Sequence, residues 1–156
     1  MLQVGAKAPD FILHNQQGEE FSSESLKGKR YLVYFYPRDN TPGCTKQACA
    51  FAEHHSKFED LNIPVIGVSK DSVASHGKFA QKYQLPFTLL SDPELQLIQG
   101  YGVWQEKKLY GKLSFGVVRS AFLIGEDGCI EQVWPKVKPE QNPLLVLEWI
   151  KENVSL

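Results

Sequence analysis

The most constraining stretch of this sequence is the segment from Pro37 to Cys49, which follows a run of aromatic and β-branched residues at 31–36. That run is typical of a buried strand, and Pro37 ends it because proline has no backbone N–H to donate to a neighbouring strand. Thr41 and Pro42 are residue types preferred at the N-cap and at the first position of a helix. The sequence therefore predicts a strand, a short loop and the start of a helix in immediate succession.

Cys44 falls in the first turn of the predicted helix. Backbone N–H groups without partners give that turn a partial positive charge, so a thiol there loses its proton more readily. The chain contains three cysteines, Cys44, Cys49 and Cys129. So low and odd a count argues against a structural disulfide framework and favours a reactive thiol or a metal site.

Strands and helices alternate through most of the chain. Strands are predicted at 11–13, 20–22, 31–36, 64–69 and 87–90, and helices at 42–61, at 72–83 and shortly after Pro93. Residues 103–116 show no regular pattern. Residues 117–124 and 129–134 flank a Gly-Glu-Asp-Gly turn, which predicts an antiparallel hairpin. A final amphipathic helix is predicted at 139–153, with Leu144, Leu147 and Ile150 on its apolar face.

This order predicts right-handed crossovers and a partly parallel sheet. The expected fold is α/β, with a central mixed β-sheet flanked by helices in three layers, α/β/α. A reactive thiol at a strand-to-helix junction within that order points to a thioredoxin-like fold. A length of 156 residues favours one domain, so we expect residues 1–156 to form a single domain.

Composition excludes some partners. The formal net charge is −1, which gives no electrostatic footprint for nucleic acid or an acidic membrane surface. No apolar run approaches the roughly 20 residues of a membrane-spanning helix, and residues 1–7 lack the apolar core of a signal peptide. We therefore expect a cytoplasmic protein.

The spacing of Cys44 and Cys49 limits what the two thiols can do together. On an ideal helix five residues give a rise of about 7.5 Å and place the two Cα atoms roughly 8–9 Å apart. A disulfide needs Cα atoms about 4.4–6.8 Å apart. Either the two thiols act separately, or the first turns of the helix unwind during a redox cycle.

A metal site would use Cys44, Cys49, His54 and His55. On a continuous helix Cys44 and His55 share a face but lie about 16 Å apart along the axis. Zinc needs its ligand atoms within about 2–2.3 Å of one point. The spacing therefore disfavours the metal interpretation.

Activation of a thiol alone gives limited acceleration. A free cysteine is already a few per cent thiolate at pH 7, so complete ionisation raises its rate by only about 30-fold. Fast cleavage of an O–O bond would need fixed donors that stabilise charge on the departing oxygen. The sequence offers the backbone N–H groups at Gly43 and Cys44, the Thr41 hydroxyl and a cation.

Only three residues are arginine. Arg30 precedes the first central strand and is expected to be solvated, and Arg38 lies in the loop and is expected to point outward. Arg119 is placed inside an apolar run at 117–124, on the strand face of Ala121 and Leu123. A charge there needs a partner, and a thiolate or an oxygen leaving from it would serve.

With these residues in view, the chain resembles the peroxiredoxins, and among them the Q subfamily, also called bacterioferritin comigratory proteins. The resemblance covers nearly the whole length. The matching segments are Gly5-x-x-Ala8-Pro9-Asp10-Phe11, Tyr34-Phe35-Tyr36-Pro37, Thr41-Pro42-Gly43-Cys44-Thr45, Ala48-Cys49, Leu89-Leu90-Ser91-Asp92, Tyr101-Gly102-Val103-Trp104 and Arg119-Ser120-x-Phe122-Leu123-Ile124.

The resemblance implies a thiol peroxidase that reduces hydrogen peroxide and organic hydroperoxides without metal, haem or flavin. By that resemblance Cys44 is the peroxidatic cysteine, Pro37 shields its thiolate, and Thr41 and Arg119 hold and polarise the peroxide. Gly43 is expected to let the substrate approach the backbone. Cys49 matches the resolving cysteine, which forms an intramolecular disulfide with Cys44.

The same resemblance implies recycling of that disulfide by thioredoxin or a similar dithiol reductant, and we expect a monomer or a weak dimer. Two positions depart from the family pattern, because Gln47 stands where many members have Glu and Ala52 where many have Arg. Cys129 is expected to be structural or exposed.

Two other functions stay open at this point. One is a redox-sensing binding module whose disulfide changes its affinity for a partner without rapid turnover. The other is a general disulfide oxidoreductase, although the four residues between Cys44 and Cys49 differ from the Cys-x-x-Cys spacing of such enzymes.

Overall fold

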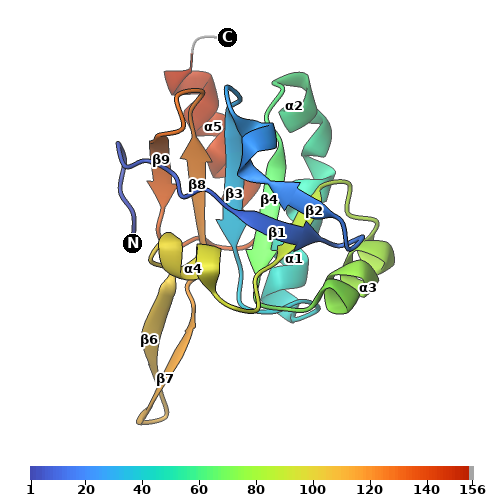
Figure 1. Ribbon diagram of the computed structural model, residues 1–156, viewed down its shortest axis with the longest axis vertical. Helices are drawn as coiled ribbons and strands as arrows, with labels where there is room; N and C mark the ends of the chain where they lie inside the picture. The colour runs from blue at the N-terminus through green and yellow to red at the C-terminus, as the bar shows by residue number, and fades with distance from the viewer. Residues whose placement is uncertain (155–156) are drawn as a thin grey trace.

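The computed structural model describes residues 1–154 of the chain. Within them, seven strands form one sheet and two more form a separate hairpin (Figure 1). The sheet strands are β1 (Ile12–Asn15), β2 (Glu20–Ser22), β3 (Tyr31–Phe35), β4 (Val65–Ser69), β5 (Thr88–Ser91), β8 (Ser120–Ile124) and β9 (Ile130–Trp134). The hairpin strands are β6 (Trp104–Leu109) and β7 (Lys112–Val117). The helices are η1 (Ser23–Leu26, a 3-10 turn), α1 (Pro42–Glu53), α2 (His55–Asp60), α3 (Val73–Tyr83), α4 (Gln96–Gly100) and α5 (Asn142–Asn153).

The sheet is mixed, with strand order β2-β1-β5-β4-β3-β8-β9. Its centre is parallel, since β3 pairs with β4 and β4 with β5 in that sense, while β8, β9, β1 and β2 pair antiparallel. Every residue of β3 and β4 is buried, as expected for strands covered on both faces. The predicted parallel core and terminal antiparallel hairpin are both confirmed.

Two hydrophobic clusters lie on opposite faces of the sheet. Along β3, Val33 and Phe35 pack into one cluster and Leu32 and Tyr34 into the other, following the period of two that places successive side chains on alternate faces. Side chains of α1, α2, α3 and α5 pack with the second cluster, whereas α4 and η1 cover the first. Figure 1 shows α4 in front of the sheet with α1 and α5 behind it. The predicted α/β/α layering is confirmed, with most of the helical mass on one face.

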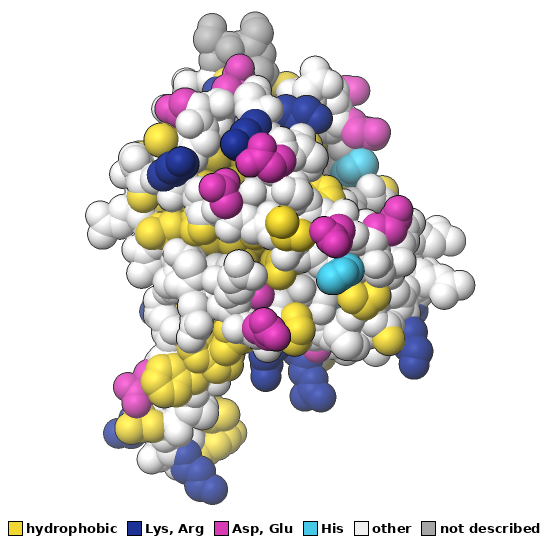
Figure 2. Space-filling model, viewed as in Figure 1, with side chains coloured by type: hydrophobic (Ala, Val, Ile, Leu, Met, Phe, Trp, Pro, Cys, Tyr) yellow, Lys and Arg dark blue, Asp and Glu magenta, His cyan; other side chains and the backbone are white. Residues whose placement is uncertain are grey.

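Residues 103–116, for which no element was predicted, form most of the β6–β7 hairpin. Tyr110 and Gly111 have φ angles of 52° and 77°, the left-handed pair that closes a two-residue hairpin. The hairpin projects from the body in Figure 1, and Figure 2 shows hydrophobic and basic side chains along it. Its signal was weak because the turn is Tyr-Gly rather than Asn-Gly and the strands carry exposed lysines.

Several boundaries differ from those predicted. The helix expected over 42–61 is two helices that meet at His54. The last helix begins at Asn142, and its buried residues include Val146 and Ile150, whereas Leu144 is 48% exposed. Arg30 is not simply solvated, because its Nε donates to Glu131 Oε1 at 2.6 Å.

The described helices include none long and apolar enough to cross a lipid bilayer.

Candidate active site

The loop from β3 to α1 has the predicted succession of strand, loop and helix start. Pro37 is half-buried at the beginning of this loop, and α1 starts at Pro42 with Cys44 in its first turn. Thr41 has the extended backbone of an N-cap residue, but its side chain does not cap the helix. Its hydroxyl instead donates to the Arg38 carbonyl at 2.9 Å, which leaves the lone pairs of the Thr41 oxygen free to accept a hydrogen bond.

Arg119 meets Cys44 across a long separation in sequence. Its Nη2 donates to Cys44 Sγ at 3.3 Å. The sequence placed Arg119 inside a strand, and this was wrong. Arg119 lies in the short connection between β7 and β8. The antiparallel register of β3 and β8 pairs Phe35 with Ser120, so Arg119 lies just past the end of β3, where the loop to α1 begins.

The sulfur of Cys44 is therefore flanked by two sources of positive charge. The Cys44 residue is 2% exposed, sits at the N-terminal turn of α1 and contacts a guanidinium group, and both influences favour negative charge on sulfur. A Cβ at Gly43 would lie 3.0 Å from Arg119 Nη2 and 3.7 Å from Pro139 Cγ. Glycine at this position thus lets the guanidinium approach the helix N-terminus.

Gln47 and Asn142 orient Arg119 from behind. Arg119 Nη1 donates to Gln47 Oε1 at 2.7 Å, and Gln47 Nε2 donates to Asn142 Oδ1 at 2.8 Å. Gln47 and Asn142 are both fully buried. The sequence singled out Gln47 only as a departure from the family pattern and did not single out Asn142 at all. The available signal for a role of Gln47 at the site was its position three residues after Cys44, because residues at that spacing share a helix face.

Lys107 of β6 is a second cation near the site that sequence reasoning missed. Its Nζ donates to the Val117 carbonyl at 2.7 Å. Partial burial lowers the pKa of Lys107, the charge of Arg119 lowers it further, and Cys44 acts in the opposite sense. Lys107, Arg119 and Val118 line a pocket of about 370 Å³ whose lining does not include Cys44.

Cys49 lies on the same helix as Cys44, and all three thiols are free. Because α1 is continuous from Pro42 to Glu53, the Cα atoms are held beyond disulfide range, as the helix geometry requires. Burial raises the pKa of the Cys49 thiol. Cys129 is partly buried next to β9, and its backbone N–H donates to Asp127 Oδ1 at 3.0 Å.

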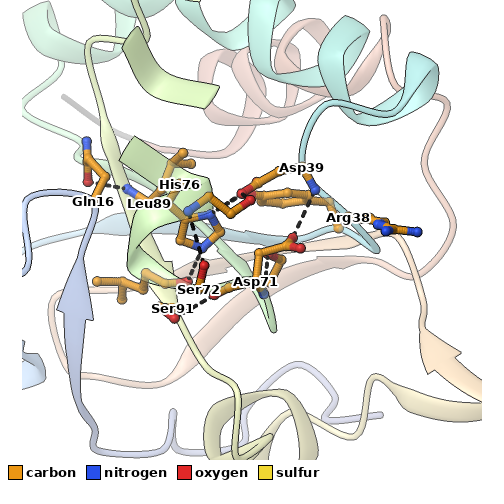
Figure 3. Close-up of polar contacts among 12 residues, drawn as sticks. Gln16, Arg38, Asp39, Asp71, Ser72, His76, Leu89 and Ser91 are labelled. Atoms are coloured by element: carbon orange, nitrogen blue, oxygen red, sulfur yellow. Dashed lines mark hydrogen bonds and ion pairs between the residues drawn. The ribbon is translucent and has the colours of Figure 1, made fainter. Parts of the chain in front are cut away.

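Asp39 ties the loop before α1 to the neighbouring elements (Figure 3). Its carboxylate accepts from the Tyr36 hydroxyl at 2.6 Å and from Ser75 Oγ at 2.8 Å, and it contacts His76 Nδ1 at 2.6 Å. Its backbone N–H donates to Asp71 Oδ2 at 2.9 Å. This loop residue, which the sequence did not single out, thereby fixes the approach to α1 against α3 and the loop after β4.

The ring of His76 is fully buried and completes this cluster. Its Nε2 lies 3.0 Å from the Leu90 carbonyl, and since a carbonyl only accepts, Nε2 must carry a proton. Within residues 1–154, Asp39, Asp71 and His76 are the one group whose ligand atoms could together hold a metal ion. Those atoms already bond to one another and to their neighbours at 2.6–3.0 Å, so the cluster fits a structural anchor. Cys44, Cys49, His54 and His55, the set that the spacing disfavoured as a metal site, do not form such a group among the described residues.

Replacing Asp39 with alanine should lower the free energy of unfolding by about 3–5 kcal/mol, because it leaves His76 and Tyr36 buried without their acceptor. Urea denaturation followed by circular dichroism measures this. Asp60→Ala, which removes an exposed carboxylate from α2, is the matched control and should stay close to the parent. Equal midpoints for the two variants would show that the cluster does not anchor the loop.

Comparison with known proteins agrees with this geometry. The family model described as the AhpC/TSA family matches residues 4–133. Peroxiredoxin Bcp of Bacillus subtilis is 43% identical over 151 residues, which cover 97% of this chain and 96% of the relative. Peroxiredoxin Bcp of Escherichia coli K12 is 41% identical over 152 residues, which cover 97% of each chain.

Solved structures give the same result. The bacterioferritin comigratory protein of Xanthomonas campestris superposes with a TM-score of 0.91 at 34% identity, covering 99% of both chains. A cysteine-to-serine variant of PrxQ from Xylella fastidiosa superposes with a TM-score of 0.93 at 31% identity, again covering 99% of both chains.

The chain therefore belongs to the AhpC/TSA family, with the thioredoxin-like fold of that family. Within the family it is similar to peroxiredoxins of the Bcp or Q type, so the resemblance stated from the sequence is confirmed. Peroxiredoxins are thiol peroxidases, which confirms the expectation of an enzyme, and the family implies peroxide substrates and a thiol reductant.

Proposed function

We propose that Cys44 is the peroxidatic residue of this thiol peroxidase and that it acts on hydrogen peroxide and organic hydroperoxides. The thiolate sulfur attacks one oxygen of ROOH, the O–O bond breaks, and the departing oxygen takes a proton to leave as ROH. Cys44 is left as a sulfenic acid. The observation that carries this proposal is the 3.3 Å contact between Arg119 Nη2 and Cys44 Sγ at the N-terminus of α1.

Arg119 does more than favour ionisation of the Cys44 thiol, because it also stabilises the departing oxygen. Ionisation accounts for at most about a 30-fold gain, so the larger share must come from donors that meet the charge developing on the departing oxygen. Arg119 has such donors beside the sulfur, and the lack of a Cβ at Gly43 leaves room for its guanidinium group. The Thr41 hydroxyl, whose proton points to the Arg38 carbonyl, is placed to accept from the O–H of the peroxide, and Pro37 shields the thiolate.

Cys49 is proposed as the resolving cysteine. Its thiolate attacks the Cys44 sulfenic acid, and water leaves as the disulfide forms. This step requires α1 to unwind between the two residues, because the closed helix holds them beyond bonding distance. Burial raises the pKa of the Cys49 thiol in the closed helix, so unwinding returns this pKa toward its ordinary value and increases the thiolate fraction.

A dithiol reductant of the thioredoxin type would then reduce the Cys44–Cys49 disulfide by exchange. A reducing compartment such as the cytoplasm suits that recycling. We propose that residues 1–156 act as one domain, because a single sheet carries strands from Ile12 to Trp134. A monomer or weak dimer suffices, since both cysteines and Arg119 belong to the same chain.

The test is to map disulfides after one equivalent of peroxide and to measure turnover with thioredoxin, thioredoxin reductase and NADPH. The parent should form a Cys44–Cys49 link and consume peroxide over many cycles. Cys49→Ser should keep the first oxidation at its parental rate and lose the internal disulfide, while Cys129→Ser, the matched control, should change neither. A link from Cys44 to Cys129 or to a second chain would refute the resolving role, and oxidation without multiple turnover would indicate a redox switch.

A further inference from the structure

The β6–β7 hairpin exposes large apolar side chains at its far end. Leu109 and Leu113 are each 65% exposed, and Tyr110, in the turn, is 95% exposed. The two strands form a sheet of their own, which projects from the body (Figure 1). A two-stranded ribbon in water buries little apolar surface, and exposed apolar groups of this size mark interaction sites. Residues 108–113, the hairpin tip, are therefore a candidate docking surface.

Apolar and basic residues are distributed so that the two faces of the hairpin tip are alike. The register opposes Leu109 to Lys112 and Lys108 to Leu113. Directly opposed residues share a face, and consecutive pairs lie on opposite faces. Each face of the tip thus carries one leucine and one lysine, with Tyr110 at the turn between them. Figure 2 shows hydrophobic and basic side chains along the hairpin.

The hairpin and the rest of the chain differ in the sign of their charge. Residues 104–117 include three lysines and one glutamate, whereas the whole chain has a formal net charge of −1. The remainder of the chain is therefore negative. An anionic surface attracts the hairpin and repels the body, so the protein approaches such a surface tip first. The whole-chain charge, from which we expected no acidic membrane partner, conceals this separation.

We propose that the hairpin tip inserts into the surface of a bilayer that contains anionic phospholipids. A flat protein surface would cover one face of the ribbon and leave the leucine of the other face in water, whereas lipid surrounds an inserted tip on every side. Leu109, Tyr110 and Leu113 enter the boundary between headgroups and acyl chains. The long stems of Lys108 and Lys112 let their ammonium groups reach back to the phosphates. This inference goes beyond the proposed function and does not depend on it.

The length of the hairpin keeps the active site in water. The Trp104–Val117 pair at its base lies five residues from the Leu109–Lys112 pair, a distance of about 17 Å along a strand. Arg119 follows that base by two residues, while an interfacial segment enters the membrane by only about 5–10 Å. Docking therefore leaves the reduction of dissolved hydrogen peroxide unchanged, and the tip can be altered without touching the reacting groups.

The experiment measures binding of the purified protein to lipid vesicles by co-sedimentation. Vesicles with equal parts of phosphatidylcholine and phosphatidylglycerol should bind the parent protein, and vesicles of phosphatidylcholine alone should bind it about 30-fold more weakly, because they lack the negative surface. Leu113→Ser should weaken binding to the anionic vesicles by about 10-fold through lost apolar burial. Lys108→Gln combined with Lys112→Gln should weaken it by about 30-fold.

Leu144→Ser and Lys151→Gln are the matched controls, because they make the same replacements at exposed positions of α5. Both should bind the anionic vesicles as the parent does. All variants should match the parent in hydrogen peroxide turnover and in circular dichroism, so a loss of docking is distinct from a loss of folding. A failure of the proposed function is distinct as well, because it would abolish turnover in the parent and leave vesicle binding intact.

Tyr110→Trp distinguishes insertion from adsorption to the headgroups. Lipids brominated in their acyl chains quench tryptophans that reach those chains, and the three tryptophans of the parent give the baseline. The fluorescence added by this substitution should be quenched in brominated anionic vesicles. The proposal is overturned if that fluorescence is not quenched, if the parent fails to bind the anionic vesicles or binds neutral ones equally well, or if the tip variants bind as the parent does.

Two other occupants of the hairpin tip would give different results. A second copy of this chain would appear in sedimentation velocity as a parent dimer that Leu113→Ser dissociates. The dithiol reductant would appear as a rise in its KM in the same variant. Either result, obtained without binding of the parent to anionic vesicles, would assign the tip to that partner and overturn the membrane proposal.

Discussion

Cys44→Ser is expected to reduce peroxide turnover to the background measured without protein, a loss of about 10⁴-fold or more for removal of a catalytic nucleophile. Serine has no sulfur to carry the sulfenic acid, and its hydroxyl is not ionised near neutral pH. Arg119 and the N-terminus of α1 stay in place, but without the sulfur their positive charge stabilises no reaction. The measurement is consumption of hydrogen peroxide with thioredoxin, thioredoxin reductase and NADPH.

The variant is well controlled because serine is close in shape to cysteine. Its urea midpoint and its circular dichroism spectrum should match those of the parent, so a loss of activity would not reflect unfolding. Cys129→Ser makes the same replacement of sulfur by oxygen at a cysteine that does not contact Arg119, and it should keep full turnover. Substantial turnover by Cys44→Ser would show that another residue is the nucleophile and would refute the proposed mechanism.

Arg119→Ala is expected to slow the oxidation of Cys44 by about 10²–10³-fold, the usual cost of removing a donor that meets charge in the transition state. The loss should exceed the roughly 30-fold that a change in thiol ionisation allows. Stopped-flow oxidation at about pH 9.5, above the ordinary thiol pKa of about 8.5, largely removes the ionisation difference. The remaining difference there measures stabilisation of the departing oxygen alone.

Two further variants sharpen this comparison. Arg119→Lys keeps a positive charge but lacks the two terminal nitrogens through which Arg119 bonds Cys44 and Gln47 separately. It should therefore recover only part of the rate. Arg38→Ala removes an exposed arginine from the loop that carries the site and should react at the parental rate. A defect in Arg119→Ala that disappears at high pH would mean that Arg119 acts only on thiol ionisation.

The part of the site that is local in sequence was predictable. The end of β3, the start of α1 at Pro42 and the place of Cys44 in its first turn all follow from residue preferences over a few neighbouring positions. Arg119 was also found, because a charge in an apolar run needs a partner. Its strand placement was wrong because β7 ends at Val117 and β8 begins only at Ser120.

The remaining parts depend on contacts between distant segments. Asp39 and His76 are separated by 37 positions, and Gln47 and Asn142 by 95. A polar residue in a loop or on a helix shows no sign of burial until its partner is known. Lys107 was missed for a related reason, since it lies on a hairpin whose exposed strands lack a clear apolar alternation.

The pairing of β3 with β8 gives this protein a built-in order of maturation. The sulfur belongs to the first third of the chain, and the arginine that serves it arrives with a strand from the last quarter. On the proposed mechanism, a nascent polypeptide that still lacks residue 119 carries a thiol of ordinary reactivity. On that mechanism the protein becomes sensitive to oxidants only after translation has delivered β8, the strand that pairs with β3.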